Sequence, residues 1–208
     1  MSTAQLILSL ILNLFVTVSV TAVCTLFIVR GSMGNMRANG REAFKYFTVQ
    51  SNVLCALVCL GEAAFEIAFL ARGGGALPRW LELLKLMSAA AVGVTCITVL
   101  FYLLPVSRFN FKQMYAGGNL FLHALCPLTA MLTWAFLERG EAFGFIWALL
   151  GLIPTFLYGA LYMDRVLIRK RWEDFYHFNV GSKWYLSVAA MLLQSLLIAA
   201  GLIALRGA

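Results

Sequence analysis

Hydrophobic residues in this chain gather into six runs, each long enough to cross a lipid bilayer as one helix. A membrane-spanning helix needs about 20 mostly apolar residues, because each residue advances the helix by about 1.5 Å. The runs occupy approximately residues 5–29, 45–71, 80–104, 118–137, 142–163 and 184–205. The pattern therefore predicts an all-α bundle of about six transmembrane helices, which forms one integral membrane domain over residues 1–208.

Polar residues inside the runs recur at the three- and four-residue spacing that marks one face of a helix. In the second run this stripe comprises Thr48, Asn52, Cys55, Cys59, Glu62 and Glu66. In the fourth run it comprises Asn119, His123, Cys126, Ala130 and Thr133. The third run carries Ser88, Ala91, Thr95, Thr98 and Tyr102, and the first carries Asn13, Thr17, Thr21 and Cys24. Because lipid cannot satisfy polar groups, we expect the four stripes to face one another.

The composition supports a membrane protein, since the chain is 62% hydrophobic and only 12% charged. Its net charge of +7 does not indicate a nucleic-acid partner, because the basic residues flank the runs. The first, third and fifth loops carry Arg30, Arg37, Arg41, Lys45, Arg108, Lys112, Arg165, Arg169, Lys170, Arg171 and Lys183. The opposite face carries Arg72, Arg79, Lys85, Arg139 and Arg206. The positive-inside rule then predicts cytoplasmic odd-numbered loops and two external termini.

The inventory of side chains argues against several kinds of site. The five cysteines lie in apolar runs without a C-x-x-C pair, so we expect small buried hydrophobic residues and no disulfide framework. The only histidines are His123 and His177, and neither belongs to a metal-ligand spacing. A glycine-rich phosphate-binding motif is also lacking. We therefore expect neither a metal nor a cofactor.

Thr48 and His123 lie at similar depth, because each is within one or two turns of a helix start on the same side of the membrane. A threonine hydroxyl becomes a nucleophile when a base such as histidine removes its proton. We predict Thr48 as the nucleophile and His123 as the general base of an acyl-transfer site. Asn52 and Asn119, one turn away, would orient these groups or donate to an oxyanion. Pro127 removes the N–H that would bond the His123 carbonyl, which predicts a kink beside the imidazole.

Three stretches of the chain resemble a family of small membrane proteins in order and spacing. They are FKYFTVQSN (44–52), VLFYLLP (99–105) and NLFLH (119–123), the last running on to Pro127 and Trp134. The family comprises bacterial six-transmembrane proteins related to the androgen-induced-gene protein and the androgen-dependent tissue-factor-pathway-inhibitor-regulating protein.

That resemblance implies a multi-pass threonine hydrolase in a bacterial inner membrane. The substrate would be a lipid with acyl chains, of the type of fatty acid esters of hydroxy fatty acids. The family's threonine falls on Thr48, and its histidine falls on His123.

The fifth loop, Arg165 to Lys183, departs from the family. Bacterial members are expected to carry Tyr-Pro-Phe with an acidic residue there, whereas this chain has FYHFN at 175–179. The mixture of aromatic and charged residues fits either an interfacial aromatic belt or a short helix that closes over a cytoplasmic cavity.

Two other functions remain open from the sequence. Glu62 and Glu66 could line the path of a transporter or channel, although an ion pair with Lys85 or Arg79 is the first expectation. Alternatively the chain is a scaffold in which small and polar stripes only pack helices. The sequence leaves the oligomeric state open.

Overall fold

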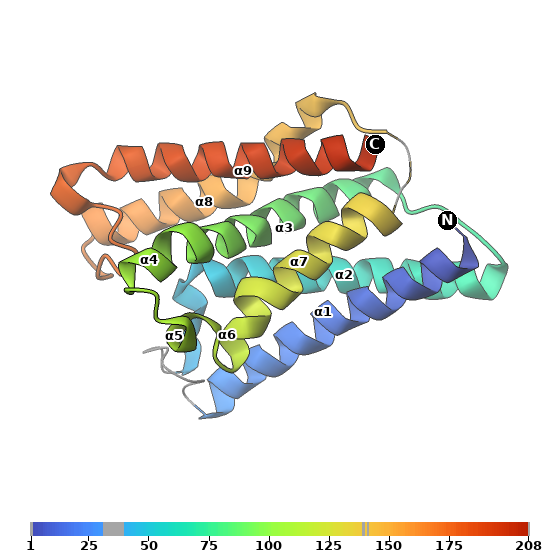
Figure 1. Cartoon of the computed structure of the whole chain (residues 1–208), viewed down its shortest axis with the longest axis horizontal. Coiled ribbons are helices and arrows are strands. Elements are labelled where there is room, and N and C mark those ends of the chain that lie inside the picture. Colours follow the sequence, from blue (N-terminus) through green and yellow to red (C-terminus); the bar gives the residue numbers. More distant parts are fainter. Residues whose placement is uncertain (1, 31–39, 139, 141, 208) are drawn as a thin grey trace.

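Six helical spans run through the computed structural model, which describes residues 2–30, 40–138, 140 and 142–207. The spans are Thr3–Arg30, Phe47–Arg72, Arg79–Val106, Gly118–Leu137, Phe145–Ile168 and Trp184–Gly207. All are long and apolar enough to cross a membrane, which confirms the predicted helical bundle, and both termini lie at one end of it (Figure 1). The fifth span departs most from the prediction, since it begins at 145 instead of 142 and continues to 168 instead of 163.

Three spans are uninterrupted α-helices, and three change their helical geometry along their length. The uninterrupted ones are α1 (Thr3–Arg30), α2 (Phe47–Arg72) and α9 (Trp184–Gly207). The third span consists of α3 (Arg79–Thr98), a π turn η2 (Val99–Leu103) and α4 (Leu104–Val106). The fourth consists of α6 (Gly118–Leu120), a π turn η3 (Phe121–Leu125), α7 (Cys126–Leu132) and a π turn η4 (Thr133–Leu137). The fifth consists of a 3₁₀ segment η5 (Phe145–Gly151), α8 (Leu152–Met163) and a π turn η6 (Asp164–Ile168).

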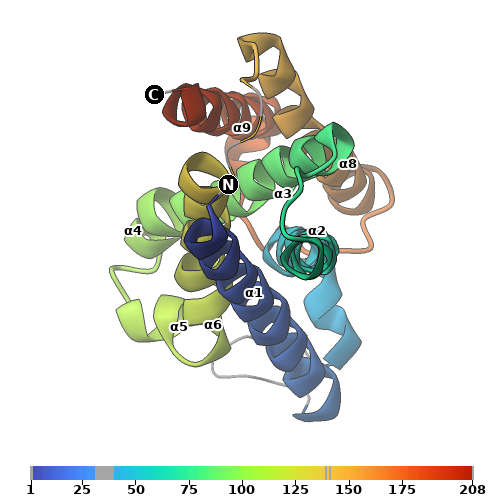
Figure 2. The ribbon, with the colours of Figure 1, turned by 90° about the vertical axis from the view of Figure 1, so that its right-hand side faces the viewer.

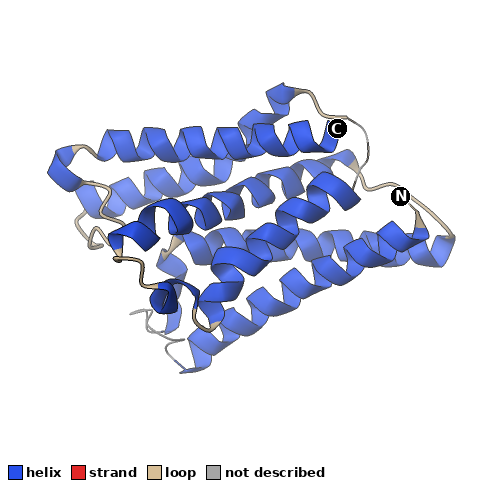
Figure 3. Cartoon of the chain, viewed as in Figure 1, coloured by secondary structure: helices blue, strands red, loops and turns tan. Residues whose placement is uncertain are grey.

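Shorter helices lie in the connections, namely η1 (Gly40–Lys45), α5 (Phe111–Tyr115) and η7 (Val180–Ser182). The wide turn η3 immediately precedes Pro127, where the missing N–H interrupts the regular ladder of hydrogen bonds. The described residues form helices and connecting turns alone (Figure 3).

The central helix is α3, which packs against α2, α7, α8 and α9, whereas α1 packs against α2 and α7 (Figure 2). The third span has the largest buried share of the six. Gly93 permits this close packing, because a Cβ at that position would lie 2.9 Å from Met131 Sδ and 3.0 Å from Ile198 Cγ2. Small residues at the centre of the bundle thus bring its helices close together.

The polar stripes of the second and fourth spans are buried along their whole length, as the sequence predicts. The third stripe is buried from Ser88 to Thr98, but Tyr102 is exposed. The prediction for the first span holds only in part, because Asn13 is buried and Thr17 is half-buried, whereas Thr21 is exposed and Ser9 joins the buried line. A threonine in a helix need not face a partner helix, since its hydroxyl can bond a carbonyl of its own helix. Thr17 bonds in both ways, donating to Asn13 O of its own helix at 2.9 Å and to Ala56 O of α2 at 3.2 Å.

Buried cations change the charge count that predicts orientation. Lys85 and Arg206 are buried beside acidic side chains and therefore do not act as loop charges. Arg37 and Arg139 also entered that count, but they lie outside the described residues. The described loop charges remain biased towards the end opposite the termini, and the sidedness stays a prediction from that bias.

Candidate functional site

A cavity of about 250 Å³ lies between α2, α3, α8 and α9, near the end of the bundle opposite the termini. Apolar and aromatic side chains form most of its wall, with hydroxyl groups from Thr48, Thr95, Thr98 and Thr155. Between α8 and α9 the cavity borders the lipid-facing surface, where its lining residue Phe156 is 59% exposed. The cavity therefore combines an apolar interior with an edge at the exposed apolar surface between α8 and α9.

The segment 169–183 forms a cap over the cavity and is held in place by Asp174. The Asp174 carboxylate accepts hydrogen bonds from the Tyr162 hydroxyl at 2.8 Å, Phe178 N at 2.9 Å and Asn179 N at 2.8 Å. These contacts position Tyr176 and Phe178 in the cavity wall. The segment thus closes over the cavity, as one interpretation of the sequence predicted, but it does so mainly through turns instead of a helix.

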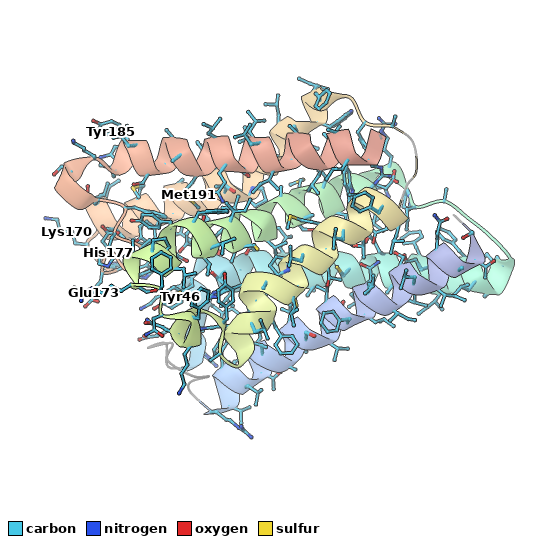
Figure 4. The ribbon with its side chains drawn as sticks, in the orientation of Figure 1. Tyr46, Lys170, Glu173, His177, Tyr185 and Met191 are labelled. Carbon is cyan, nitrogen blue, oxygen red and sulfur yellow. The ribbon has the colours of Figure 1, made fainter. Side chains whose placement is uncertain are left out.

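Figure 4 shows where labelled side chains lie around this end of the bundle. Lys170, Glu173 and His177 lie at its outer edge, and Tyr46 lies beside the start of α2. Met191 projects from α9 towards α3, where its sulfur accepts a hydrogen bond from the Thr98 hydroxyl at 3.6 Å. Of the labelled residues, Lys170 and Glu173 thus bring charge to the rim, whereas Met191 lies between α9 and α3.

Thr48 differs from the other threonines of the wall in its surroundings. The hydroxyls of Thr95, Thr98 and Thr155 bond to Ser51, Gln194 and Ser195, respectively, each on a neighbouring helix. The Thr48 hydroxyl instead lies beside the Tyr176 hydroxyl, in the first turn of α2. The wall therefore holds one threonine whose hydroxyl faces the cap and not another helix.

The hydroxyl of Tyr176 is enclosed at the start of α2, where it accepts a hydrogen bond from Phe47 N at 3.0 Å. Burial raises the pKa of Tyr176 to about 12, although hydrogen bonds from Phe47 N, Tyr158 and Thr48 oppose that rise. The phenol therefore keeps its proton at neutral pH, and it can serve as a hydrogen-bond donor beside Thr48.

Asn52 connects the turn that carries Thr48 with the helix that carries His123. Its Nδ2 donates to Thr48 O at 2.8 Å and to Leu122 O at 3.0 Å. The fully buried Oδ1 has no hydrogen-bond partner among the described residues. The free atom of the side chain is therefore an acceptor. Of the two roles predicted for Asn52, this geometry supports orienting its neighbours and not donating a hydrogen bond to an oxyanion.

The imidazole of His123 is buried and anchored to the short helix α5. Its Nδ1 lies 2.6 Å from Met114 O, and since a carbonyl can only accept, Nδ1 carries the hydrogen. In the neutral ring Nε2 then has a free lone pair, which is the state that a general base requires. Asn119 is anchored beside it by donation from Nδ2 to Gln113 O at 3.0 Å, and its Oδ1 is likewise unpartnered in the described chain.

The structure thus brings together Thr48, Asn52 and the peptide that precedes His123. It does not place His123 in the wall of the cavity, and within the described residues no hydrogen bond joins the Thr48 hydroxyl to the imidazole. Catalytic hydrogen bonds are often long in the absence of substrate, so direct contact between Thr48 and His123 is not required of the unliganded protein.

Two residues of the site were not identified from the sequence. Tyr176 and Asp174 belong to the aromatic fifth loop, whose contacts depend on how the loop folds back onto α2 and α8. The only signal was the dense mixture of aromatic and charged residues.

Of the two acids of the second span, Glu62 forms the expected ion pair with Lys85, whereas Glu66 contacts the neutral side chain of Asn13. Lys85 contacts the Glu62 carboxylate, and Glu62 and Glu66 are both fully buried. Arg79 lies instead over the rings of Phe143 and Trp147. Both acids are enclosed by protein, which is not the arrangement of a water-filled ion path.

Within the described residues, no group of three or more His, Cys, Asp or Glu side chains is placed to hold a metal ion. Comparison of the chain with protein-family models, with curated proteins and with solved structures finds no match. The family resemblance read from the sequence therefore stays a prediction.

Proposed function

We propose that this chain is an integral membrane hydrolase that cleaves ester bonds of lipids, with Thr48 as its nucleophile and His123 as its general base. The observation that carries the proposal is the position of Thr48, which lines an apolar cavity that borders the exposed surface between α8 and α9. The buried His123, with Nδ1 committed to Met114 O, supplies a base on the adjoining helix. The site would face the cytoplasmic leaflet if the odd-numbered loops are cytoplasmic.

The cavity suits an acyl chain because its wall is mainly apolar and its neighbouring medium is lipid. An apolar protein cavity of about 150 Å³ accommodates benzene, so about 250 Å³ offers room for roughly ten carbon atoms. The chain would enter between α8 and α9, past the exposed Phe156. Its ester group would then lie near Thr48 and the cap.

The proposed reaction has two halves. His123 Nε2 takes the proton of the Thr48 hydroxyl as Oγ1 attacks the ester carbonyl, and the Tyr176 phenol donates a hydrogen bond to the developing oxyanion. When the intermediate collapses, the ester C–O bond breaks and the imidazolium returns its proton to the alcohol leaving group. His123 then takes a proton from water as the water oxygen attacks the acyl–threonine ester. The imidazolium returns that proton to Thr48 Oγ1 when the acyl–oxygen bond breaks and the fatty acid leaves. The first step requires the Thr48 hydroxyl to turn from Tyr176 towards His123 as substrate binds.

A lipophilic fluorophosphonate probe tests this proposal directly, because it reacts covalently with an activated hydroxyl. We expect the parent protein in detergent to be labelled, and Thr48→Ala and His123→Ala to lose at least about 90% of that labelling. Thr133→Ala, at another buried threonine, and His177→Asn, at the exposed histidine of the cap, are the matched controls. Undiminished labelling of Thr48→Ala, with the parent labelled, would exclude Thr48 as the nucleophile.

A second candidate function is the binding or carriage of an acyl lipid without chemistry. It is favoured by the pairing of Thr48 with Tyr176 and by the absence of His123 from the described cavity wall. Under this alternative the cavity would bind lipid, but Thr48→Ala would have little effect on the affinity for fatty acid. An unlabelled parent protein that still binds fatty acid would support it.

Gly159 provides a way to test whether the cavity holds the acyl chain. It lines the cavity in α8, and a Cβ added there meets no atom within 4 Å. Gly159→Phe should therefore occupy part of the cavity from an unobstructed Cβ and weaken binding of a fluorescent fatty acid by about tenfold or more, the cost of excluding a few methylene groups. Gly201→Phe is the matched control, because Gly201 is an exposed glycine of α9 with equally open surroundings. Equal affinity of both variants would place the acyl chain elsewhere.

A further inference from the structure

A cluster of ionisable side chains is buried in the half of the bundle that contains the termini. It consists of Glu62 and Glu66 of α2, Lys85 of α3, and Glu138 directly after η4. Each of the four is at most 1% exposed. This cluster lies at the opposite end of α2 from Thr48 and plays no part in the proposed hydrolysis. Ionisable groups at such a depth are costly and are seldom retained without a role.

Lys85 and Asn13 hold the cluster together. The Lys85 ammonium contacts the Glu62 carboxylate and donates to Glu138 Oε1 at 3.1 Å and to Asn13 Oδ1 at 2.7 Å. Its three N–H groups are thereby all used. Asn13 Nδ2 in turn donates to Glu138 Oε1 at 3.0 Å and lies 3.3–3.4 Å from both oxygens of Glu66.

The charges of the cluster do not balance. Three carboxyl groups surround one ammonium group, and the nearby Arg206 is committed to Glu82 and to the ring of Trp134. If every carboxyl group were ionised, two negative charges would have no cationic partner among the described residues of this enclosed site, which is strongly unfavourable. Ser9 of α1 and Cys59 of α2 are further described neighbours of the cluster, and both are neutral; Glu82, which also acts on Glu138, is the partner of Arg206.

Unpartnered oxygens point to the same imbalance independently. Glu62 Oε1 and Glu138 Oε2 are buried and have no hydrogen-bond partner among the described residues. An unpartnered buried oxygen costs more on an ion than on a neutral acid, and the described residues supply fewer hydrogen-bond donors than three carboxylates would require.

The contacts also distinguish the three acids. Glu62 and Glu138 both contact Lys85, whereas the partners of Glu66 are the neutral side chains of Asn13 and Ser9. We propose that this cluster is a proton-binding site, in which Glu66 carries a bound proton at neutral pH while Glu62 is the ionised partner of Lys85. The site would exchange its proton with the compartment on the side of the termini whenever the peripheral helix α1 admits water to it.

Infrared spectroscopy of the intact protein in detergent at neutral pH tests the proposal. The parent should show the carbonyl stretch of a protonated carboxylic acid, shifted when all glutamates carry ¹³C at the carboxyl carbon. Glu66→Gln, which keeps size and shape, should abolish that band. Glu62→Gln, the same change one turn away on the same helix, should retain it.

Each result decides the proposal without reference to hydrolysis. Absence of the band from the parent would overturn the bound proton. Persistence of the band in Glu66→Gln would overturn the assignment to Glu66, and this comparison with the parent stands even if Glu62→Gln fails to fold. Loss of the band in folded Glu62→Gln, with retention in Glu66→Gln, would place the proton on the partner of Lys85 and contradict the assignment.

Discussion

Thr48→Ala and His123→Ala should each lower kcat/KM for a lipid ester by about 10³-fold or more, and the double variant should be no slower than the slower single variant. A nucleophile and its base act as a unit, so removing either one already removes the covalent route. The residual rate would come from substrate binding and from groups such as Tyr176 that remain in place. Release of fatty acid from a purified ester substrate, measured in detergent at several substrate concentrations, provides kcat and KM separately.

Two outcomes would contradict this prediction. If the two single effects multiplied in the double variant, Thr48 and His123 would act independently and not as nucleophile and base. If KM rose while kcat stayed unchanged, Thr48 would contact the substrate without reacting with it. The latter result would favour the lipid carrier, for which Thr48 is merely part of the cavity wall.

Lys85→Met should destabilise the protein by about 3–5 kcal/mol, because it removes the cation from a fully buried cluster of acids. The loss should be smaller at low pH, where protons can neutralise the carboxylates that the ammonium group had balanced. Lys112→Met is the matched control, since Lys112 is exposed at the other end of the bundle. Chemical denaturation in detergent micelles, at neutral and acidic pH, measures the difference.

A double variant separates charge from packing at this position. Lys85→Met combined with Glu62→Leu should recover part of the lost stability, because an apolar pair replaces an uncompensated ion. If Lys85→Met is as stable as Lys112→Met at neutral pH, the acids of the cluster are already neutral without Lys85. That result would mean that the cluster holds more protons than the one assigned to Glu66.

The two ends of α2 therefore have separate chemistry. Near its start, Thr48 contributes to an apolar cavity closed by the aromatic cap. Near its end, Glu62 and Glu66 belong to an enclosed ionic cluster. A single stripe of polar residues along one helix serves both, so the variants that test one end leave the other intact.

The hydrophobic pattern alone determined the number of spans and nearly all their limits, because the thickness of the bilayer sets the length of each run. The stripes of the second and fourth spans were equally predictable, since carboxylates, carboxamides and imidazoles have no partner in lipid. The first stripe was predictable only in part, because Asn13 is buried but Thr21 is exposed, and a threonine hydroxyl can be satisfied within its own helix. Thr48, Asn52, Asn119 and His123 could be singled out, but not the atoms that they present.

Those atoms depend on contacts between residues far apart in the chain. The Oδ1 of Asn52 has no partner among the described residues because its Nδ2 donates to Leu122 O, 70 positions away. The tautomer of His123 is determined by Met114 O. Glu138 joins Lys85 only because η4 ends beside α3. Helical periodicity determines which face a residue occupies, whereas the crossing of helices and the folding of the cap determine what it meets there. The cavity, the cap and the unbalanced ionic cluster were therefore decided by the tertiary structure alone.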